Sequence, residues 1–299
     1  MDWDNLRYFL ELSRGGTLAA AARRLAVEHT TVSRRIQALE KQMGAALFAR
    51  HAGGHKLTEA GRQLLPAAEA MEAAVLGVER AAPTSHEGPS GLVRVGATEG
   101  FGTLILAPLL AQLTRRHPHL SVDLLALPRM LHLSRREADI VISLERPTRG
   151  SVIVSRLSGY ALYLYGQREY LARKPLITAR DDLRHHDFVS YVDDLLFTKE
   201  LQFLDALYRP ERFAFRSTSI TAQHAAVRAG AGLAVLPAFI ADRDPLLTRV
   251  LPQEASFTRT FWMSMPSETK HLARMQVTWA YLREAVATQQ GLLQPQGTR

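Results

Sequence analysis

Hydrophobic side chains recur at helical spacing along roughly the first 80 residues. The stretch DNLRYFLELSR places its apolar residues within two turns, and the glycine pair that follows is typical of a helix end. Thr17 is placed to cap a second helix, which we expect over 17–25. After a short connection, an apolar stripe that includes Val32 and Leu39 predicts a third helix over 29–42. The second and third helices have the spacing of a helix-turn-helix pair.

A small hairpin or wing is expected next, because two glycines lie between Phe48 and Leu57. Thr58 then precedes an alanine-rich helix, which Pro66 should bend. Five positions of this helix alternate by four and three residues, as in the seam of a two-stranded coiled coil. A helix that lies on its own domain shows a similar spacing, so both interpretations stand. The seam residues are Leu64, Ala68, Met71, Val75 and Val78.

Between residues 82 and 91, prolines, glycines and polar residues interrupt the periodic pattern, which indicates a hinge between domains. From there on, strand-like segments, among them 151–157 and 160–166, alternate with helical ones. This alternation predicts an α/β fold with largely parallel sheets. The chain then consists of a helical domain (1–58), a long linker helix (59–82), a hinge (83–90) and an α/β domain (91–299).

The composition excludes several classes of protein. Hydrophobic residues make up 46% and charged residues 22% of the chain, as in ordinary globular proteins. Because there is no cysteine, a disulfide framework and a thiolate metal site are excluded, which suits a reducing cytoplasm. The acidic, polar start is unlike a signal peptide, and no window of about 18 apolar residues predicts a membrane span. A net charge of +8 favours a polyanionic partner.

The start of the third helix is rich in hydrogen-bond donors. Thr30, Ser33 and Arg34 face away from the apolar stripe. In helix-turn-helix pairs, such residues meet base edges in the major groove of DNA. Arg34 can bind guanine through two hydrogen bonds, the threonines can bind bases or touch thymine methyl groups, and Arg35 flanks them near the phosphates. The alternative is a solvated face on a helical bundle.

These residues resemble a known family. The motifs VSRRI..LE, LF.R and LTEAG, within about the first 65 residues, are similar to the winged helix-turn-helix of LysR-type transcriptional regulators. That family usually has serine and glutamine where this chain has Glu28 and His29, so its operator preference does not carry over unchanged. We expect Glu28 to be the N-cap of the recognition helix. The resemblance implies DNA contacts from His29, Thr30, Thr31, Ser33, Arg34, Arg35, Arg50 and Lys56.

The resemblance also implies partners. Family members dimerise through the long helix, and two joined DNA-binding domains imply double-stranded promoter DNA with a partly palindromic site. A homodimer or homotetramer in the cytoplasm is therefore expected, with RNA polymerase as a further partner and with no membrane contact. Neither a cofactor, a metal nor a catalytic residue is implied. In the wing, His55 either approaches the DNA backbone or belongs to a solvated turn.

By the same resemblance, the α/β domain is a two-lobed effector domain similar to periplasmic binding proteins. Lobe I spans about 91–162 and 267–299, and lobe II about 163–266. Hydroxyls at helix starts suit an anionic effector such as an organic acid, although ordinary capping also places them there. If Glu99 points inward, it favours a ligand that bears an amine or hydroxyl, or an uncharged one. The expected lining residues are Thr98, Glu99, Gly100, Thr103, Ser143, Ser217, Thr218 and Ser219.

Two other classes of protein share some of these features. An α/β enzyme would need a catalytic constellation, but the histidine pairs HPH and HH have no partner at metal-ligand spacing. The motifs G-x-S-x-G and G-x-G-x-x-G and a phosphate-binding loop are also absent from any suitable context. A solute-binding protein accounts for two lobes but not for the N-terminal module. We therefore expect a transcriptional regulator, not an enzyme, whose promoter binding responds to a small effector.

Overall fold

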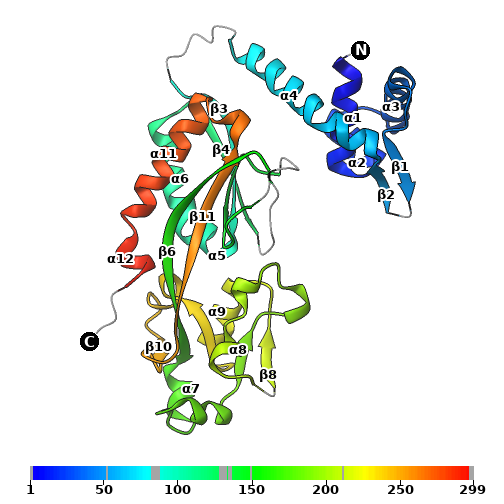
Figure 1. Ribbon diagram of the computed structural model, residues 1–299. Helices are drawn as coiled ribbons and strands as arrows, with labels where there is room; N and C mark the ends of the chain where they lie inside the picture. Colours follow the sequence, from blue (N-terminus) through cyan, green and yellow to red (C-terminus); the bar gives the residue numbers. More distant parts are fainter. Residues whose placement is uncertain are drawn as a thin grey trace. The chain divides into compact units, whose positions relative to one another are not determined.

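The chain divides into two units, Met1–Glu87 and Gly88–Arg299, and each has its own hydrophobic core. Figure 1 shows their helices and strands. The hinge expected at 83–90 falls mostly outside the described part of the chain. The structure, a computed structural model, describes residues 3–51, 53–81, 88–127, 133, 137–148, 150–210 and 212–295.

Helices and one hairpin form the first unit. Its elements are α1 (Trp3–Gly15), α2 (Leu18–Leu25), α3 (His29–Met43), β1 (Phe48–His51), β2 (Gly54–Leu57) and α4 (Glu59–Ala81). The apolar positions predicted from the sequence are buried, so that Leu6, Phe9 and Leu12 of α1 share one core with Val32 and Leu39 of α3. The three helices contact one another, and α1 also contacts α4.

The turn between α2 and α3 closes as expected. Thr17 caps α2, because its side chain accepts a hydrogen bond of 3.2 Å from the N–H of Ala20. Ala26 ends the helix in the left-handed conformation, with φ of 54°. The N–H of Val27 then donates to the carbonyl of Ala22 at 3.1 Å, which satisfies the helix end. The predicted helix-turn-helix pair is confirmed.

Two glycines allow the hairpin and α4 to approach the rest of the first unit closely. Gly54, with φ of 122°, lies so near the carbonyl oxygen of Gly16 that any Cβ would overlap it. Gly61, in the first turn of α4, meets the carbonyl oxygen of Leu47 in the same way. The carboxylate of Glu40 accepts a hydrogen bond of 2.7 Å from the N–H of Leu47, which ties the end of α3 to the hairpin. The wing is thereby held in a defined position relative to α3.

The side chain of His55 in β2 packs against the first unit and is not directed outward toward DNA. Its ring meets Phe48 edge-on with the centroids 6.4 Å apart, and its Nδ1 is buried with no hydrogen-bond partner among the described residues. Burial lowers the pKa of His55, and the nearby charges of Arg50 and His51 lower that pKa further. The imidazole is therefore neutral at pH 7.

The long helix α4 lies partly on its own unit, which corrects part of the predicted seam. Ala68 is 0% exposed within the core of the first unit, and Leu64 packs against the same core. Leu64 and Ala68 therefore pack as expected for a helix that lies on its own domain, and not as residues of a coiled-coil seam. Met71 is 45% exposed and remains accessible to a second copy. The side chains of Val75 and Val78 lie outside the described residues.

An ion pair fastens α4 to α1. Arg14 donates two hydrogen bonds to the carboxylate of Glu72, of 3.1 and 2.7 Å, and a third of 3.2 Å to Glu11. The Arg14 side chain is almost fully buried, and its geometry is the bidentate one that makes such pairs strong. The helix continues through Pro66.

A mixed sheet of seven strands forms the frame of the second unit. Its strands are β3 (Gly91–Thr98), β4 (Leu120–Leu127), β5 (Ile140–Ser143), β6 (Val152–Gln167), β9 (Ala234–Pro237), β10 (Leu247–Val250) and β11 (Ser256–Pro266). The order is β10-β6-β11-β5-β3-β4, and β9 also pairs with β6. β3 is parallel to β4 and β5, whereas β6 is antiparallel to β9, β10 and β11. The expectation of a largely parallel sheet is wrong for the strands around β6.

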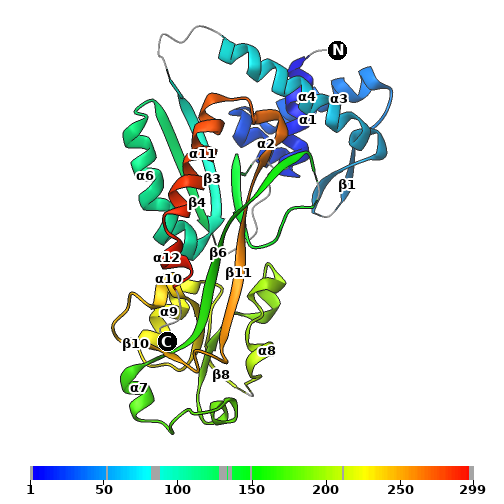
Figure 2. The same ribbon diagram turned by 60° about the vertical axis from the view of Figure 1, so that its left-hand side comes forward.

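Two long strands, β6 and β11, run side by side from one lobe to the other (Figures 1 and 2). Lobe I contains β3, β4 and β5, and lobe II contains β9 and β10. β6 is one strand where the sequence predicted two, because its pairing with β11 continues through the serine and glycine at 158–159. The lobe boundary expected at 162 falls inside β6. β11 belongs to both lobes and not to lobe II alone, since Trp262 pairs with Ser143 of β5.

Helices begin at the strand ends and cover the sheet. In lobe I, α5 (Glu99–Phe101), a π-helical turn η1 (Gly102–Leu106) and α6 (Ala107–Arg116) follow β3 directly. None of the described helices is both long and apolar enough to cross a membrane. The small parallel sheet of lobe II consists of β7 (Phe188–Ser190) and β8 (Phe213–Arg216). The other helices are α7 (Arg168–Ala172), α8 (Leu204–Leu207), α9 (Ile220–Arg228), α10 (Ala238–Ala241), α11 (Ala273–Ala287), α12 (Gln290–Leu293) and the short 3₁₀ turns Arg180–His185, Asp193–Leu195, Lys199–Leu201 and Ser267–Thr269.

Replacing Gly61 with alanine should destabilise the first unit, because the new Cβ overlaps the backbone carbonyl of Leu47. We expect the free energy of unfolding to fall by about 1–3 kcal/mol, although alanine ordinarily stabilises a helix relative to glycine. Chemical denaturation followed by circular dichroism measures the change. Gly291→Ala in α12 is the matched control, since a Cβ there meets nothing within 4 Å. Equal stability of G61A and the wild type would contradict the close approach.

The lowered pKa of His55 predicts a loss of stability in mild acid. The unfolded chain binds this proton near pH 6.5, whereas the folded protein binds it only at lower pH. The free energy of unfolding should therefore fall as the pH drops below about 6.5. His55→Gln cannot titrate and should show a smaller fall between about pH 7.5 and about pH 5.5 in denaturation experiments. Exposed His271→Gln is the control, and an unchanged pH dependence of H55Q would refute the assignment.

Candidate DNA-binding face and effector cavity

The outer side of α3 carries most of the residues predicted to contact DNA. His29, Thr30 and Arg34 are exposed, and Thr31 and Ser33 are half-buried. The apolar stripe on the opposite side of the helix is buried in the core of the first unit. The polar start of α3 therefore faces outward.

Glu28 is the N-cap of α3, as expected, but its side chain makes no capping hydrogen bond. Its backbone carbonyl accepts hydrogen bonds from the N–H groups of Thr31, at 3.0 Å, and Val32, at 3.3 Å. The exposed carboxylate lies near the start of the helix, where the helix dipole favours a negative charge.

Arg35 lies against α1 and not on the outer face. Its guanidinium is 3.5 Å from the carboxylate of Asp4 and 3.4 Å from the side-chain oxygen of Asn5. It also lies over the ring of Tyr8, 5.8 Å from the centroid. This geometry favours a role in seating α3 on α1 over the phosphate contact predicted from the sequence.

Arg50 and Lys56 are the exposed cations of the wing. They lie on the two paired strands of the hairpin, where Arg50 is opposite His55 and Lys56 is opposite Ala49. Because their side chains are exposed and long, both can reach phosphates of a duplex beside α3.

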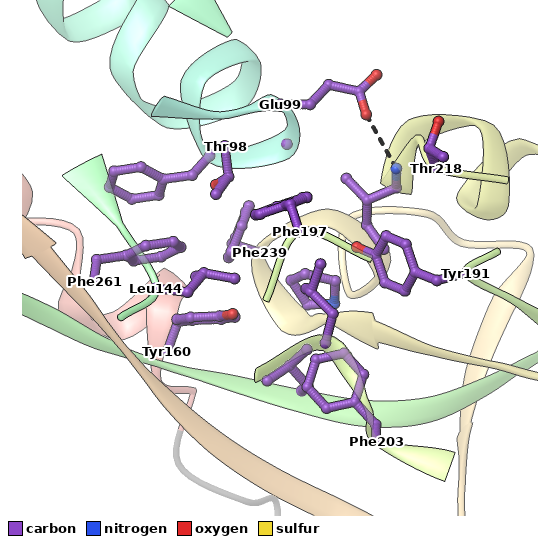
Figure 3. Close-up of a pocket in the computed structure, with 16 residues that line it drawn as sticks. Thr98, Glu99, Leu144, Tyr160, Tyr191, Phe197, Phe203, Thr218, Phe239 and Phe261 are labelled. Carbon is purple, nitrogen blue, oxygen red and sulfur yellow. Dashed lines mark hydrogen bonds between the residues drawn. The ribbon is translucent and has the colours of Figure 1, made fainter. Parts of the chain in front are cut away.

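A cavity lies between the two lobes of the second unit (Figure 3). Its wall is largely aromatic, and Phe261 stacks on Phe101 and Tyr160 with centroid distances of 4.0 and 4.2 Å. The cavity volume is about 40 Å³, which holds a few water molecules at about 10–15 Å³ each. A ligand with an aromatic ring therefore needs side chains or lobes to move apart. Other apolar lining residues include Leu144, Tyr191, Phe203 and Phe239.

Glu99 reaches from lobe I to the start of α9 in lobe II. One carboxylate oxygen accepts hydrogen bonds from the hydroxyls of Ser219, at 2.8 Å, and Thr221, at 2.6 Å. The other oxygen accepts from the N–H of Ile220 at 3.0 Å, which is the dashed line in Figure 3. Ser219 is also the N-cap of α9 and accepts from the N–H of Ala222. The donors at this helix start are thus occupied by a carboxylate of the same chain.

A second carboxylate also joins the lobes. Glu145, which follows β5 in lobe I, accepts a hydrogen bond from the hydroxyl of Thr198 in lobe II. Both contacts pair a lobe II hydroxyl with a lobe I carboxylate. Together they hold the lobes in the arrangement seen here.

The cavity brings together some of the predicted effector residues but not all of them. Thr98, Glu99, Gly100 and Thr218 line it. Thr103 instead is exposed on the π-helical turn η1, so it does not line the cavity.

Three predicted serines form hydrogen bonds within the chain. Ser219 caps α9, and the hydroxyl of Ser217 accepts a hydrogen bond of 3.1 Å from the N–H of Ser219. These two follow the alternative of ordinary capping. Ser143 donates to the backbone carbonyl of Glu145 at 2.7 Å and does not line the cavity.

The aromatic wall was not predicted from the sequence. Tyr160 and Phe261 lie on β6 and β11, whose apolar patterns indicated only buried core. One signal was available: YALYLYG places three tyrosines, each with a polar tip, in one buried strand. Among the described residues, no cluster of three acidic or histidine side chains could hold a metal ion.

Known proteins match this chain over both units. The family model described as bacterial regulatory helix-turn-helix protein, lysR family, matches residues 3–62, and the LysR substrate binding domain matches residues 86–287. The Mau operon transcriptional activator of Paracoccus denitrificans is 31% identical over 244 residues, covering 80% of this chain and 81% of that protein. The regulator CrgA of Neisseria meningitidis is 25% identical over 258 residues, covering 85% and 86%.

Solved structures share the fold. ArgP from Mycobacterium tuberculosis has a TM-score of 0.66 at 19% identity, and the match covers 96% of this chain and 98% of ArgP. Full-length CbnR in complex with its target DNA has a TM-score of 0.56 at 24% identity, covering 95% and 100%. The matching families cover the helix-turn-helix and the two-lobed unit described above. The chain therefore belongs to the LysR family of bacterial transcriptional regulators.

Proposed function

We propose that this regulator binds promoter DNA through the outer face of α3 and the wing, and that a small molecule in the cavity between the lobes controls this binding. The observation that carries the proposal is the two-sided character of α3. His29, Thr30 and Arg34 are exposed at its start, while the opposite stripe is buried. The net charge of +8 supports a polyanionic partner.

The proposed contacts divide into base readers and phosphate binders. Arg34 has the length and the paired donors to bind guanine in the major groove, and His29 and Thr30 can bind neighbouring base edges. Thr31 and Ser33, half-buried at the same end, serve bases or phosphates nearby. The wing then supplies the phosphate contacts through Arg50 and Lys56.

A dimer or tetramer would bind a partly palindromic site. The exposed side of α4 at Met71 supports pairing with a second copy of this helix. Two recognition helices related by two-fold symmetry would then meet two half-sites of related sequence.

Control by an effector would act through the lobes. Because a ring-sized ligand does not fit the closed cavity, side chains or lobes must move to admit it, and the proposed control uses a changed arrangement of the lobes. That change would re-space the DNA-binding units of the oligomer and alter the access of RNA polymerase in the cytoplasm. No catalytic step is part of this proposal.

A selection of genomic fragments on the purified protein, at about 150 mM salt, tests the proposal. Recovery of a short interrupted palindrome supports a dimeric regulator, and its neighbouring genes nominate effectors. Fragments without a common sequence would overturn it.

Variants of two arginines should separate base reading from phosphate binding. Arg34→Ala should cost about 1–3 kcal/mol on the selected site and relax base preference at one position, because a guanine contact is lost. Arg50→Ala should weaken binding to all sequences and reduce the salt slope by about 0.9 per protomer. Exposed Arg283→Ala in α11 controls for the loss of charge. Equal losses of R34A on every sequence, measured by fluorescence anisotropy, would reassign Arg34 to a phosphate.

Met71→Asp should shift the protein toward the monomer, because a buried carboxylate is unfavourable in a helix-helix seam. Sedimentation velocity measures the shift. Met43→Asp is the matched control, since Met43 is 40% exposed but lies at the end of α3. If both variants keep the wild-type oligomeric state, this part of α4 is not the interface.

A further inference from the structure

The start of α9 has the donors of an anion site, and the chain itself fills that site. A backbone N–H and two hydroxyls converge there, at a helix end where the dipole favours negative charge. All three donate to the carboxylate of Glu99. A ligand carboxylate would need the same donors, so Glu99 competes with it directly.

Gly100, the residue after Glu99, packs closely against lobe II. A Cβ on Gly100 would lie 2.8 Å from Cγ2 of Ile220 and 3.0 Å from Cδ1 of Ile240, so α5 and lobe II are in close contact there. An anionic ligand in the adjoining cavity would also face the charge of the half-buried Glu99 carboxylate, which opposes a second negative charge nearby. The site therefore disfavours carboxylate ligands.

Two phenol hydroxyls of the cavity have no protein partner. Tyr160 is 3% exposed and Tyr191 is 9% exposed, and neither hydroxyl makes a hydrogen bond within the described part of the chain. In Figure 3 both oxygens point toward the space between the lining side chains. Burial raises the pKa of both phenols, so their protons remain available for donation. Neither oxygen belongs to the fully buried side-chain atoms that have no hydrogen-bond partner, so each is open toward the cavity, where a ligand oxygen can accept a hydrogen bond from it.

Resting on the proposed function of this cavity as the effector site, we propose that its ligand is a small uncharged molecule. The ligand has an apolar or aromatic body and an acceptor oxygen directed at Tyr160 and Tyr191. Glu99 is the specificity-determining residue that excludes carboxylates. The aromatic stack of Phe101, Phe261 and Tyr160 supplies the surface for the apolar body. The charge that a carboxylate ligand would bring to α9 is already present.

Neutral and anionic probes of the same shape test the ligand class. Benzamide against benzoate, and the smaller isobutyramide against isobutyrate, differ mainly in charge. Titration calorimetry on the full-length wild type should show that the amide of at least one pair binds about tenfold or more tightly than its carboxylate. Equal affinity within both pairs, tighter binding of the carboxylates, or no binding of either amide would overturn the proposal.

Replacing Glu99 should reverse the preference. Glu99→Ala frees the three donors at α9, so benzoate or isobutyrate should gain about tenfold or more in affinity relative to the matching amide. Acetate at about 0.1 M should also raise the melting temperature of E99A more than that of the wild type, since it can occupy the vacated position. Chloride at equal ionic strength is the control. Glu99→Gln keeps the side-chain length and should show the same direction of change; no gain of anion binding in either variant refutes the role of Glu99.

The tyrosine contact has its own variant. Tyr160→Phe should weaken amide binding about tenfold, while Tyr163→Phe, on the same strand but outside this cavity, should not. Equal effects of the two variants would remove Tyr160 from the ligand contact. These titrations contain no DNA, so failure of the ligand class is distinguishable from failure of promoter binding, which the fragment selection measures separately.

Discussion

The antiparallel pairing of β6 with β11 is the contact on which the second unit depends. β9 and β10 attach to β6 in lobe II, and β5 attaches to β11 in lobe I, so both lobes are built outward from one strand pair. The ladder runs from Val152 and Pro266 to Tyr163 and Ser256. The carboxylate contacts between the lobes are few by comparison. They can break while the ladder persists, which allows two lobe arrangements within one folded unit.

The chemistry at α9 shows how one helix start can serve either a ligand or the chain itself. Hydroxyls followed by a helix are correctly understood as an anion-binding pattern, but the anion here is Glu99, 120 residues before Ser219. Under the ligand class proposed above, this internal charge leaves shape and hydrogen bonding to the phenols to discriminate among ligands. Because the carboxylate belongs to the chain, the contact between the lobes at the start of α9 needs no bound ion.

Local features were predictable and long-range ones were not. The cap at Thr17, the recognition helix and the wing follow from spacing and from residues adjacent in the chain. The seam in α4 was only partly predictable. A heptad pattern shows that a helix has an apolar stripe but not what packs against that stripe, and Ala68 packs in the core of its own unit. The serine and glycine at 158–159 resembled a turn until pairing with β11 extended the strand. The position of Arg35 was likewise not predictable, because it is set by contacts with Asp4 and Tyr8 on another helix.

The ladder between β6 and β11 has one change of register among its described pairs, between Phe261 and Trp262, where Leu157 on the opposite strand has no direct partner. A bulge of this kind is the place where a strand pair twists and bends most readily. Phe261 is also the central ring of the aromatic stack that lines the cavity. If the cavity holds the proposed effector, a molecule that displaces this ring would act directly at the bulge, so the point where the strand pair bends most readily and the proposed effector site would share a side chain.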